Sequence, residues 1–262
     1  MSLETLSLKE TNDCITLTLN RVQQKNAINS MMLQELNRIL DYAEEKKHCR
    51  LIILEGQEGF FCTGMDFQEL TKKFPTSDSA GFHHWTSQYM ATLKRFATTS
   101  KVIVASVDGA VIAGGVGLAA ASDLVIATKR SSFKLSEALW GLLPSMVAPY
   151  LIRRIGFQKT YALSLTCQTV EAQEAHSFHL IDVLTDNPHE AIQEILRRVS
   201  RLEITTVSNL KAYFRKLWII NESMENAAVD MTTTLLSDPI AQAKIMDFIE
   251  RGRSSLPWEP SI

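Results

Sequence analysis

The sequence has little excess of charge of either sign, and this excludes one large class of partners. Its 262 residues carry 27 Lys and Arg against 29 Asp and Glu, for a formal net charge of −2. A protein that binds nucleic acid through the phosphate backbone needs a basic face, and no segment of this chain concentrates Lys or Arg. We therefore expect no nucleic-acid partner, while a basic pocket for an anionic substrate stays compatible with these numbers.

Cysteine is also scarce, and its spacing fits neither a disulfide framework nor a metal site. The sequence has no C-x-x-C pair and no Cys/His ligand pattern around its four cysteines, which are Cys14, Cys49, Cys62 and Cys167. Such isolated cysteines are typical of free thiols in a reducing compartment. We expect no disulfide and no bound metal.

No apolar run is long enough to cross a bilayer. The uncharged stretch over residues 109–122 is rich in glycine, and it is shorter than the roughly 20 apolar residues that a spanning helix needs. The first residues, Met1 to Glu4, carry an acid where a secretory signal needs positive charge and then an apolar segment. These features predict a cytoplasmic protein without a membrane partner.

The apolar residues that are present form an α/β pattern. Residues 15–19 alternate in polarity, and residues 51–54, 102–107 and 125–127 are short apolar runs typical of buried strands. Helices are expected from Ser30, as a cap, and over residues 83–98. After Ser136 the pattern is helical, and Asp238 with Pro239 marks the start of a last helix. The sequence thus predicts an α/β core followed by a helical C-terminal region.

Two glycine-containing loops, residues 59–67 and 108–118, directly follow two of the predicted buried strands. Glycine allows backbone conformations that aim an N–H group into a cavity, and N–H groups at a helix start favour negative charge. Each loop alone is compatible with an ordinary tight turn. The second loop also lacks the G-x-G-x-x-G spacing of a dinucleotide site.

Taken together and in this order, the loops resemble those of the crotonase (enoyl-CoA hydratase/isomerase) superfamily. Residues 25–29 look like its N-A-x-N motif, residues 133–144 like its F-x-x-P-E-x-x-x-G-x-x-P segment, and residues 169–182 like its A-x-x-A-x-x-x-G-L-V-D element. The resemblance spans about residues 3–258. It implies one domain over residues 1–262, with a ββα-spiral core (1–200) and a helical oligomerisation region (201–262) that forms a homotrimer or hexamer.

The resemblance also implies an active site without a cofactor. Its substrate is a thioester, carried on the phosphopantetheine of an acyl carrier protein or on CoA. Its oxyanion hole consists of the backbone N–H groups of Met65 and Gly114, which stabilise the enolate formed beside the thioester carbonyl. Glu137 stands where the family has its second catalytic carboxylate. The first would stand three residues after Gly114, where this chain has Gly117.

The missing carboxylate argues against ordinary hydration, in which two acids hold the attacking water. One carboxylate suffices for an isomerase, or for a syn elimination in which Glu137 removes a C2 proton and returns it to the leaving hydroxyl. Burial beside Leu139 and Trp140 would raise the pKa of this carboxylate.

A narrower resemblance concerns the dehydratases of polyketide β-branching cassettes, carried by residues 61–69, 135–142, 151–156 and 257–259. These enzymes convert 3-hydroxy-3-methylglutaryl-acyl carrier protein to 3-methylglutaconyl-acyl carrier protein, and the resemblance implies the same lyase activity and an acyl carrier protein as partner. Two alternatives stay open. One is an enoyl-CoA isomerase or hydratase of fatty-acid metabolism, and the other is a non-catalytic crotonase-fold binding protein.

Further residues are candidates for substrate or carrier contacts, each with a plainer alternative. Cys62 and Asp66 adjoin the first loop, where a buried apolar side chain and a helix cap are the alternatives. The helix that flanks the acyl pocket in the family carries four candidates for the distal carboxylate of the substrate, which otherwise form a solvated face: His83, His84, Tyr89 and Lys94. Arg21 and Lys25 are candidates for the carrier phosphates, or are simply solvated cations.

Overall fold

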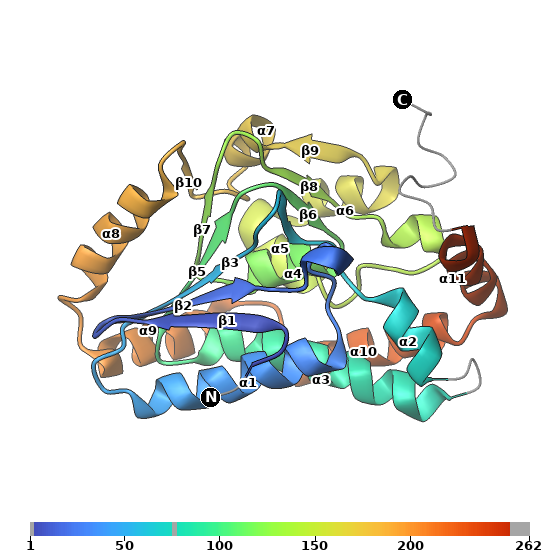
Figure 1. The fold of residues 1–262 in the computed structure, drawn as a ribbon, viewed down its shortest axis with the longest axis horizontal. Coiled ribbons are helices and arrows are strands. Elements are labelled where there is room, and N and C mark those ends of the chain that lie inside the picture. Colours follow the sequence, from blue (N-terminus) through green and yellow to red (C-terminus); the bar gives the residue numbers. More distant parts are fainter. Residues whose placement is uncertain (1–2, 75–77, 252–262) are drawn as a thin grey trace.

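The computed structural model describes residues 3–74 and 78–251 as two sheets surrounded by helices (Figure 1). The larger sheet has the order β1-β2-β3-β5-β7-β10, with strands Leu6–Glu10, Cys14–Leu19, Leu51–Glu55, Val102–Val107, Leu124–Ala127 and Val183–Leu184. The smaller sheet has the order β4-β6-β8-β9, with strands Phe60–Cys62, Ala110–Ile112, Ser132–Lys134 and Thr169–Glu171. β1 is antiparallel to β2 and β9 to β8, and the other pairs are parallel.

Successive strand pairs alternate between the two sheets. In each of the pairs β3–β4, β5–β6 and β7–β8, the first strand joins the larger sheet and the second joins the smaller one. A helical segment follows each pair before the chain returns to the larger sheet. This repetition is the ββα spiral, and it confirms the predicted α/β fold.

Helices cover both faces of the larger sheet. α1 (Ser30–Glu45) and α3 (Ser79–Thr98) run along one side of the molecule, and α8 (Pro188–Val199) lies at the far end (Figure 1). Ile52 of β3 belongs to the main core, whereas its neighbours Leu51 and Ile53 pack in a second cluster with Ile192 of α8. Both faces of β3 are therefore buried, which explains its unbroken apolar run.

The remaining helices follow the strands or form the C-terminal region. They are η1 (Val22–Gln24), α2 (Phe67–Lys73), α4 (Gly114–Ala121), η2 (Glu137–Trp140), α5 (Ala148–Ile155), α6 (Phe157–Thr166), α7 (Ala172–Ser177), α9 (Ile204–Leu217), α10 (Glu222–Leu236) and α11 (Pro239–Arg251). As predicted, α11 begins at Pro239, and Asp238 Oδ1 accepts hydrogen bonds from the N–H groups of Ile240 and Ala241.

Two local predictions were wrong. Asn29 caps α1 in place of Ser30, because its Oδ1 accepts the N–H of Met32 at 2.9 Å while Ser30 is already helical. The region after Ser136 also contains two short strands, β9 and β10. Each is stabilised by a strand distant in sequence, β8 and β7 respectively, so no local pattern announced it.

Residues 257–259, which carry part of the narrower resemblance to the polyketide dehydratases, lie outside the described ranges. No helix in the described part of the chain is long and apolar enough to span a membrane. Residues 3–74 and 78–251 also hold no group of three His, Cys, Asp or Glu side chains that could bind a metal. The four cysteines are buried free thiols.

Candidate active site

The three predicted site groups come from the ends of three adjacent strands. β4, β6 and β8 are neighbouring parallel strands of the smaller sheet. Met65 follows β4, Gly114 follows β6, and Glu137 follows β8. Because the carboxyl ends of parallel strands meet at one edge of a sheet, groups far apart in sequence converge there.

The backbone of the first loop turns the N–H of Met65 away from its neighbouring segment. Ile28 forms a parallel bridge with this loop: its N–H donates to Gly64 O at 2.6 Å, and its carbonyl accepts the N–H of Asp66 at 2.9 Å. Since these bonds use the residues on both sides, the N–H of Met65 points the opposite way. It has no acceptor among the described residues, and Met65 lines a pocket.

The second loop lies directly against the first. Gly64 has φ +87, and a Cβ on it would lie 3.2 Å from the nitrogen of Gly114, so only glycine fits this position easily. Gly114 is the first residue of α4, where an N–H has no partner within the helix. Ala113 before it has φ 49 and ψ −118, a strained conformation for a non-glycine residue. Gly114 lines the same pocket as Met65, and no backbone acceptor for its N–H is found among the described residues. We infer that this N–H is directed toward the pocket.

Glu137 supplies a buried carboxyl group to the same pocket. Its side chain is 9% exposed, and its Oε2 has no hydrogen-bond partner among the described residues. Burial raises the pKa of Glu137 to about 7, against a smaller lowering by the backbone N–H groups of Ser136 and Glu137. A carboxyl group with this pKa can both accept and return a proton near neutral pH.

These groups share one pocket of about 440 Å³ with mainly apolar walls. Trp140 on the wall contacts Phe67 of α2 and Phe248 of α11, with ring centroids 5.5 and 5.0 Å away. The C-terminal helix therefore contributes to the wall opposite the strand ends. Exclusion of water from such a pocket strengthens the electrostatic effect of the backbone donors.

Asp66 and Arg21 are engaged with each other. Asp66 caps α2 by accepting the N–H of Glu69 at 3.0 Å, and its other oxygen accepts a bond from Arg21 Nη2 at 2.7 Å. Arg21 also donates to the carbonyl of Ala27. The pair thereby braces the segment that contacts the first loop. Lys25 is exposed beside the ring of Phe60, 5.3 Å away, and lines the pocket.

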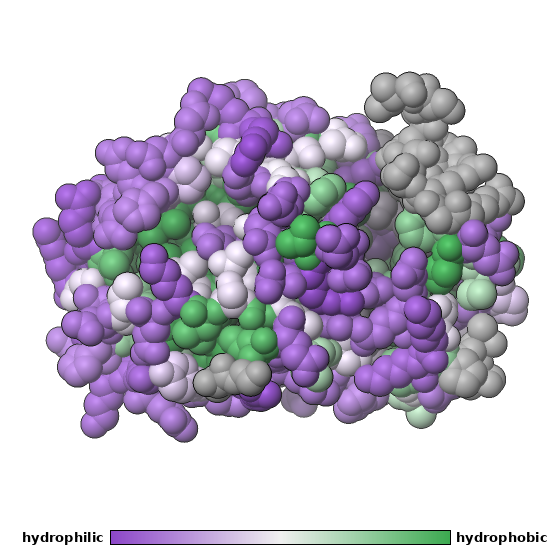
Figure 2. Space-filling model, viewed as in Figure 1, coloured by the Kyte–Doolittle hydropathy of each residue, from purple (hydrophilic) through white to green (hydrophobic). Residues whose placement is uncertain are grey.

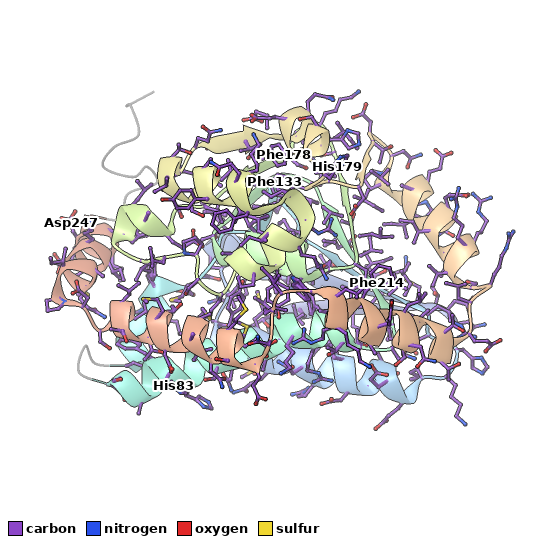
Figure 3. All side chains as sticks on the ribbon, turned by 180° about the vertical axis from the view of Figure 1, so that it is seen from behind. His83, Phe133, Phe178, His179, Phe214 and Asp247 are labelled. Atoms are coloured by element: carbon purple, nitrogen blue, oxygen red, sulfur yellow. The ribbon has the colours of Figure 1, made fainter. Side chains whose placement is uncertain are left out.

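Of the four candidates on α3, only Tyr89 lines the pocket. His83 is exposed near Asp230 on the outer side of α3 (Figure 3), and His84 is exposed as well. Lys94 pairs with Glu225 at 2.8 Å. Cys62 is fully buried in β4 behind the pocket wall, and burial raises the pKa of its thiol to about 12. His83 and His84 thus lie on a solvated face and Cys62 is a buried apolar side chain, whereas Lys94 is held in an ion pair with the buried Glu225.

Two residues outside the predicted set contribute to the site. Ile28, within the segment that looks like the N-A-x-N motif, holds the first loop through its backbone. Phe248 reaches the pocket wall from α11. An aromatic residue in an amphipathic helix gives no local sign of which pocket it lines.

Comparison with known proteins identifies the family. The model of the enoyl-CoA hydratase/isomerase family matches residues 9–259. The chain belongs to this family. A solved structure supports the fold: that of the Bacillus subtilis protein pksH, described as a polyketide biosynthesis enoyl-CoA hydratase, superposes with a TM-score of 0.87 at 28% identity, covering 97% of this chain and all (100%) of that one.

Curated relatives agree in kind of activity. The bacillaene synthase dehydratase PksH of Bacillus subtilis is 31% identical over 249 residues, covering 93% of this chain and 92% of that protein. The enoyl-CoA hydratase EchA19 of Mycobacterium tuberculosis is 30% identical over 207 residues, covering 72% and 77% respectively. Dehydratases and enoyl-CoA hydratases are both hydro-lyases, and this crotonase-fold chain is an enzyme of that kind.

Proposed function

We propose that this enzyme dehydrates a 3-hydroxy-3-methylglutaryl thioester, carried on an acyl carrier protein, to the 3-methylglutaconyl thioester in polyketide β-branching. The observation that carries the proposal is the single available carboxylate. Two acidic residues line the pocket among the described residues, and Asp66 is committed to Arg21 and to a helix cap, which leaves Glu137. The similarity to a polyketide dehydratase supports the same choice.

In the proposed elimination, Glu137 acts first as the base and then as the acid. Glu137 removes a C2 proton while the N–H groups of Met65 and Gly114 stabilise the negative charge on the thioester oxygen. The electron pair then forms the C2–C3 double bond as the C3–O bond breaks. Glu137 returns its proton to the leaving oxygen, which departs as water, and the base is regenerated. Only removal of the C2 proton gives an enolate whose oxygen these N–H groups can stabilise, so the double bond forms between C2 and C3.

The carrier is proposed to approach from the side of the pocket that Lys25 occupies. Lys25 is exposed and lines the pocket, and its ammonium group has no carboxylate within ion-pair distance among the described residues. It is therefore a better candidate for a phosphate of phosphopantetheine or CoA than Arg21, whose guanidinium is held by Asp66.

We expect dehydration without decarboxylation. Loss of water requires a base at C2 and a proton for the hydroxyl, which Glu137 supplies alone, whereas loss of carbon dioxide requires a separate acid for the resulting dienolate. The six histidines, His48, His83, His84, His176, His179 and His189, all precede the C-terminal region. Mass spectrometry of the carrier-bound product, with this enzyme alone, should show loss of one water and a retained carboxylate.

The same experiment separates the alternatives. A decarboxylated product, or no reaction on either the carrier-bound or the CoA-bound substrate, would overturn the proposal. Turnover of unbranched enoyl-CoA thioesters in place of the branched substrate would favour an isomerase or hydratase of fatty-acid metabolism. Binding of acyl thioesters without any turnover would favour a non-catalytic binding protein.

We further propose that the chain forms a single domain that assembles as a homotrimer, or a dimer of trimers, through its C-terminal helices. α9 exposes an apolar stripe at helical spacing, Leu210, Tyr213, Phe214 and Leu217, with Phe214 labelled in Figure 3. Ile219, Met224 and Met231 are exposed as well, but Ile220 is 3% exposed and is buried within the chain. Ile220 is thus not part of the surface that assembly would cover.

Light scattering should accordingly give the mass of a trimer or hexamer at micromolar concentration. Introducing two charges, Phe214→Glu with Leu217→Glu, should lower the measured mass, because burial of charged groups in an apolar interface is unfavourable. A monomeric wild-type protein would contradict the assembly.

The face of the molecule shown in Figure 2, opposite the view of Figure 3 in which Phe214 is labelled, is largely hydrophilic, and its apolar residues appear in separate places.

A further inference from the structure

The environment of Gly117 is determined by a side chain from another helix. Gly117 is a buried residue of α4. A Cβ at this position would lie 2.1 Å from the hydroxyl oxygen of Tyr89 and 3.0 Å from Cγ2 of Val147. Real atoms do not approach to 2.1 Å without a bond, so the hydroxyl of Tyr89 occupies the space that a side chain at position 117 would need. A side chain at 117 and this hydroxyl exclude each other.

The hydroxyl of Tyr89 is held rigidly at the pocket wall. Tyr89 is 2% exposed, lines the pocket, and stacks on Trp85 with ring centroids 5.9 Å apart. Its O–H donates to the carbonyl of Gly114 at 2.6 Å. The hydroxyl oxygen therefore lies beside the residue whose N–H faces the pocket, at the point where the family's first carboxylate is missing.

The same hydroxyl is a neutral hydrogen-bond acceptor. Burial, together with the negative charges that Cys62 and Glu137 can carry, raises the pKa of Tyr89 well above its usual value, so the group keeps its proton at physiological pH. That proton is already donated in the hydrogen bond to the carbonyl oxygen of Gly114. A phenolic oxygen that donates one hydrogen bond retains lone pairs with which to accept another.

We propose that Tyr89 is a catalytic residue of the dehydration: its hydroxyl oxygen accepts the O–H of the C3 hydroxyl of the substrate and holds this leaving group where Glu137 returns the proton. The inference rests on the function proposed above and adds the group that contacts the leaving hydroxyl.

The role involves no net transfer of a proton by Tyr89. Glu137 takes the C2 proton, the C3–O bond breaks with its electron pair on oxygen, and that oxygen receives the proton from Glu137 to leave as water. Throughout, Tyr89 keeps its own proton, which stays hydrogen-bonded to the carbonyl oxygen of Gly114. A second carboxylate so close to Glu137 would place like charges in a buried pocket and would raise the pKa of one of them further. A neutral acceptor avoids this repulsion and still orients the hydroxyl.

The first measurement compares Tyr89→Phe with a matched control on a 3-hydroxy-3-methylglutaryl thioester. The phenylalanine keeps the ring and its stacking on Trp85, so the fold should persist. We expect kcat to fall roughly tenfold to a hundredfold, as for loss of one hydrogen bond that acts in the transition state, with KM changed by less than about threefold. Tyr150→Phe is the control, because Tyr150 is equally buried but does not line the pocket; its kcat should stay within about twofold of the wild type.

A rescue experiment separates this role from support of Gly114. Removing the hydroxyl of Tyr89 eliminates the 2.1 Å contact and leaves tight contacts of a Cβ with Val147 Cγ2 at 3.0 Å and with the ring Cζ at 3.3 Å. Small shifts of these side chains let Tyr89→Phe/Gly117→Glu present a carboxylate there. A carboxylate accepts the substrate O–H but cannot donate to the Gly114 carbonyl. We therefore expect this double variant to recover at least about tenfold of the lost kcat. Tyr89→Phe/Gly117→Ala, which adds bulk without an acceptor, should recover nothing, and Gly117→Glu alone should clash with the hydroxyl and lose activity.

The outcomes are distinguishable once each variant is checked for folding by circular dichroism. An active wild-type enzyme with an unaffected Tyr89→Phe variant overturns the inference and leaves the dehydratase proposal intact. Loss of kcat in Tyr89→Phe without rescue by the folded Tyr89→Phe/Gly117→Glu variant assigns Tyr89 to support of Gly114 and overturns the inference. A wild-type enzyme that does not dehydrate the substrate overturns both proposals.

Discussion

Glu137→Gln is expected to lower kcat by at least about 10³-fold, because it removes the group proposed as both base and acid. The amide has nearly the shape of the carboxyl group but cannot accept the C2 proton. The fold should be retained, since Oε2 of Glu137 has no hydrogen-bond partner among the described residues. Steady-state kinetics on the carrier-bound substrate provide the measurement, and circular dichroism provides the folding control.

The pH dependence of kcat/KM provides an independent test of the role of Glu137. Burial raises the pKa of Glu137 to about 7, and the base form is required, so kcat/KM of the wild type should fall with unit slope as pH drops below about 7. The folded state also binds a proton more tightly than the unfolded state, so this group's contribution to stability decreases as pH rises from the usual carboxyl range to about 7. Above that pH, Glu137→Gln should therefore melt at a temperature no lower than the wild type.

If Glu137→Gln keeps more than a few per cent of the wild-type kcat, another group acts as the base.

Gly114→Pro is expected to lower kcat by roughly 10²- to 10³-fold, the loss measured elsewhere for one oxyanion donor, or about 3–4 kcal/mol. Proline removes the N–H that faces the pocket from the start of α4. It also restricts the residue before it to extended conformations, which Ala113 with φ 49 and ψ −118 does not have. Thermal melting must therefore accompany the kinetics, because part of the loss can come from the backbone.

Two further variants isolate the donor. Gly114→Ala keeps the N–H, and its Cβ would lie 3.3 Å from the side-chain ends of Ile28 and Tyr89, a tight but adjustable contact. We expect it to lose less than about tenfold. Met65→Ala keeps the other N–H and changes only packing, so about threefold or less is expected. Similar losses in Gly114→Pro and Gly114→Ala, with both proteins folded, would contradict the oxyanion assignment.

The parts of the site that depend on the backbone were accessible from the sequence. A glycine after a buried strand needs a special φ, and a helix start leaves its first N–H without a partner, so Gly64 and Gly114 carry their signal locally. Glu137 carries no such local signal, because an acid at a helix start is also typical of a solvated surface. The family resemblance then predicted that these local features form one active site.

Roles that depend on long-range contacts were not accessible in this way. Arg21 looks like a candidate phosphate ligand until the fold brings Asp66 within 2.7 Å of its guanidinium. His83 and His84 share a helix with Tyr89, but the rotation of α3 against the core exposes the histidines and buries the tyrosine. A helical pattern of this kind specifies which face is apolar but not which pocket that face will line.

The sequence by itself therefore determined the fold class, because the periodicity of its apolar residues is a local property, and it located the two glycine-containing loops. The donor role of these loops and the role of Glu137 stay predictions that the family resemblance implies. Only the tertiary structure decided what fills the position of the absent carboxylate. Gly117 is an unremarkable glycine in a helix until α3 packs beside α4 and brings the hydroxyl of Tyr89 into the space that a Cβ would need. Contacts between segments this far apart in the chain depend on how whole elements pack, and no local pattern encodes them.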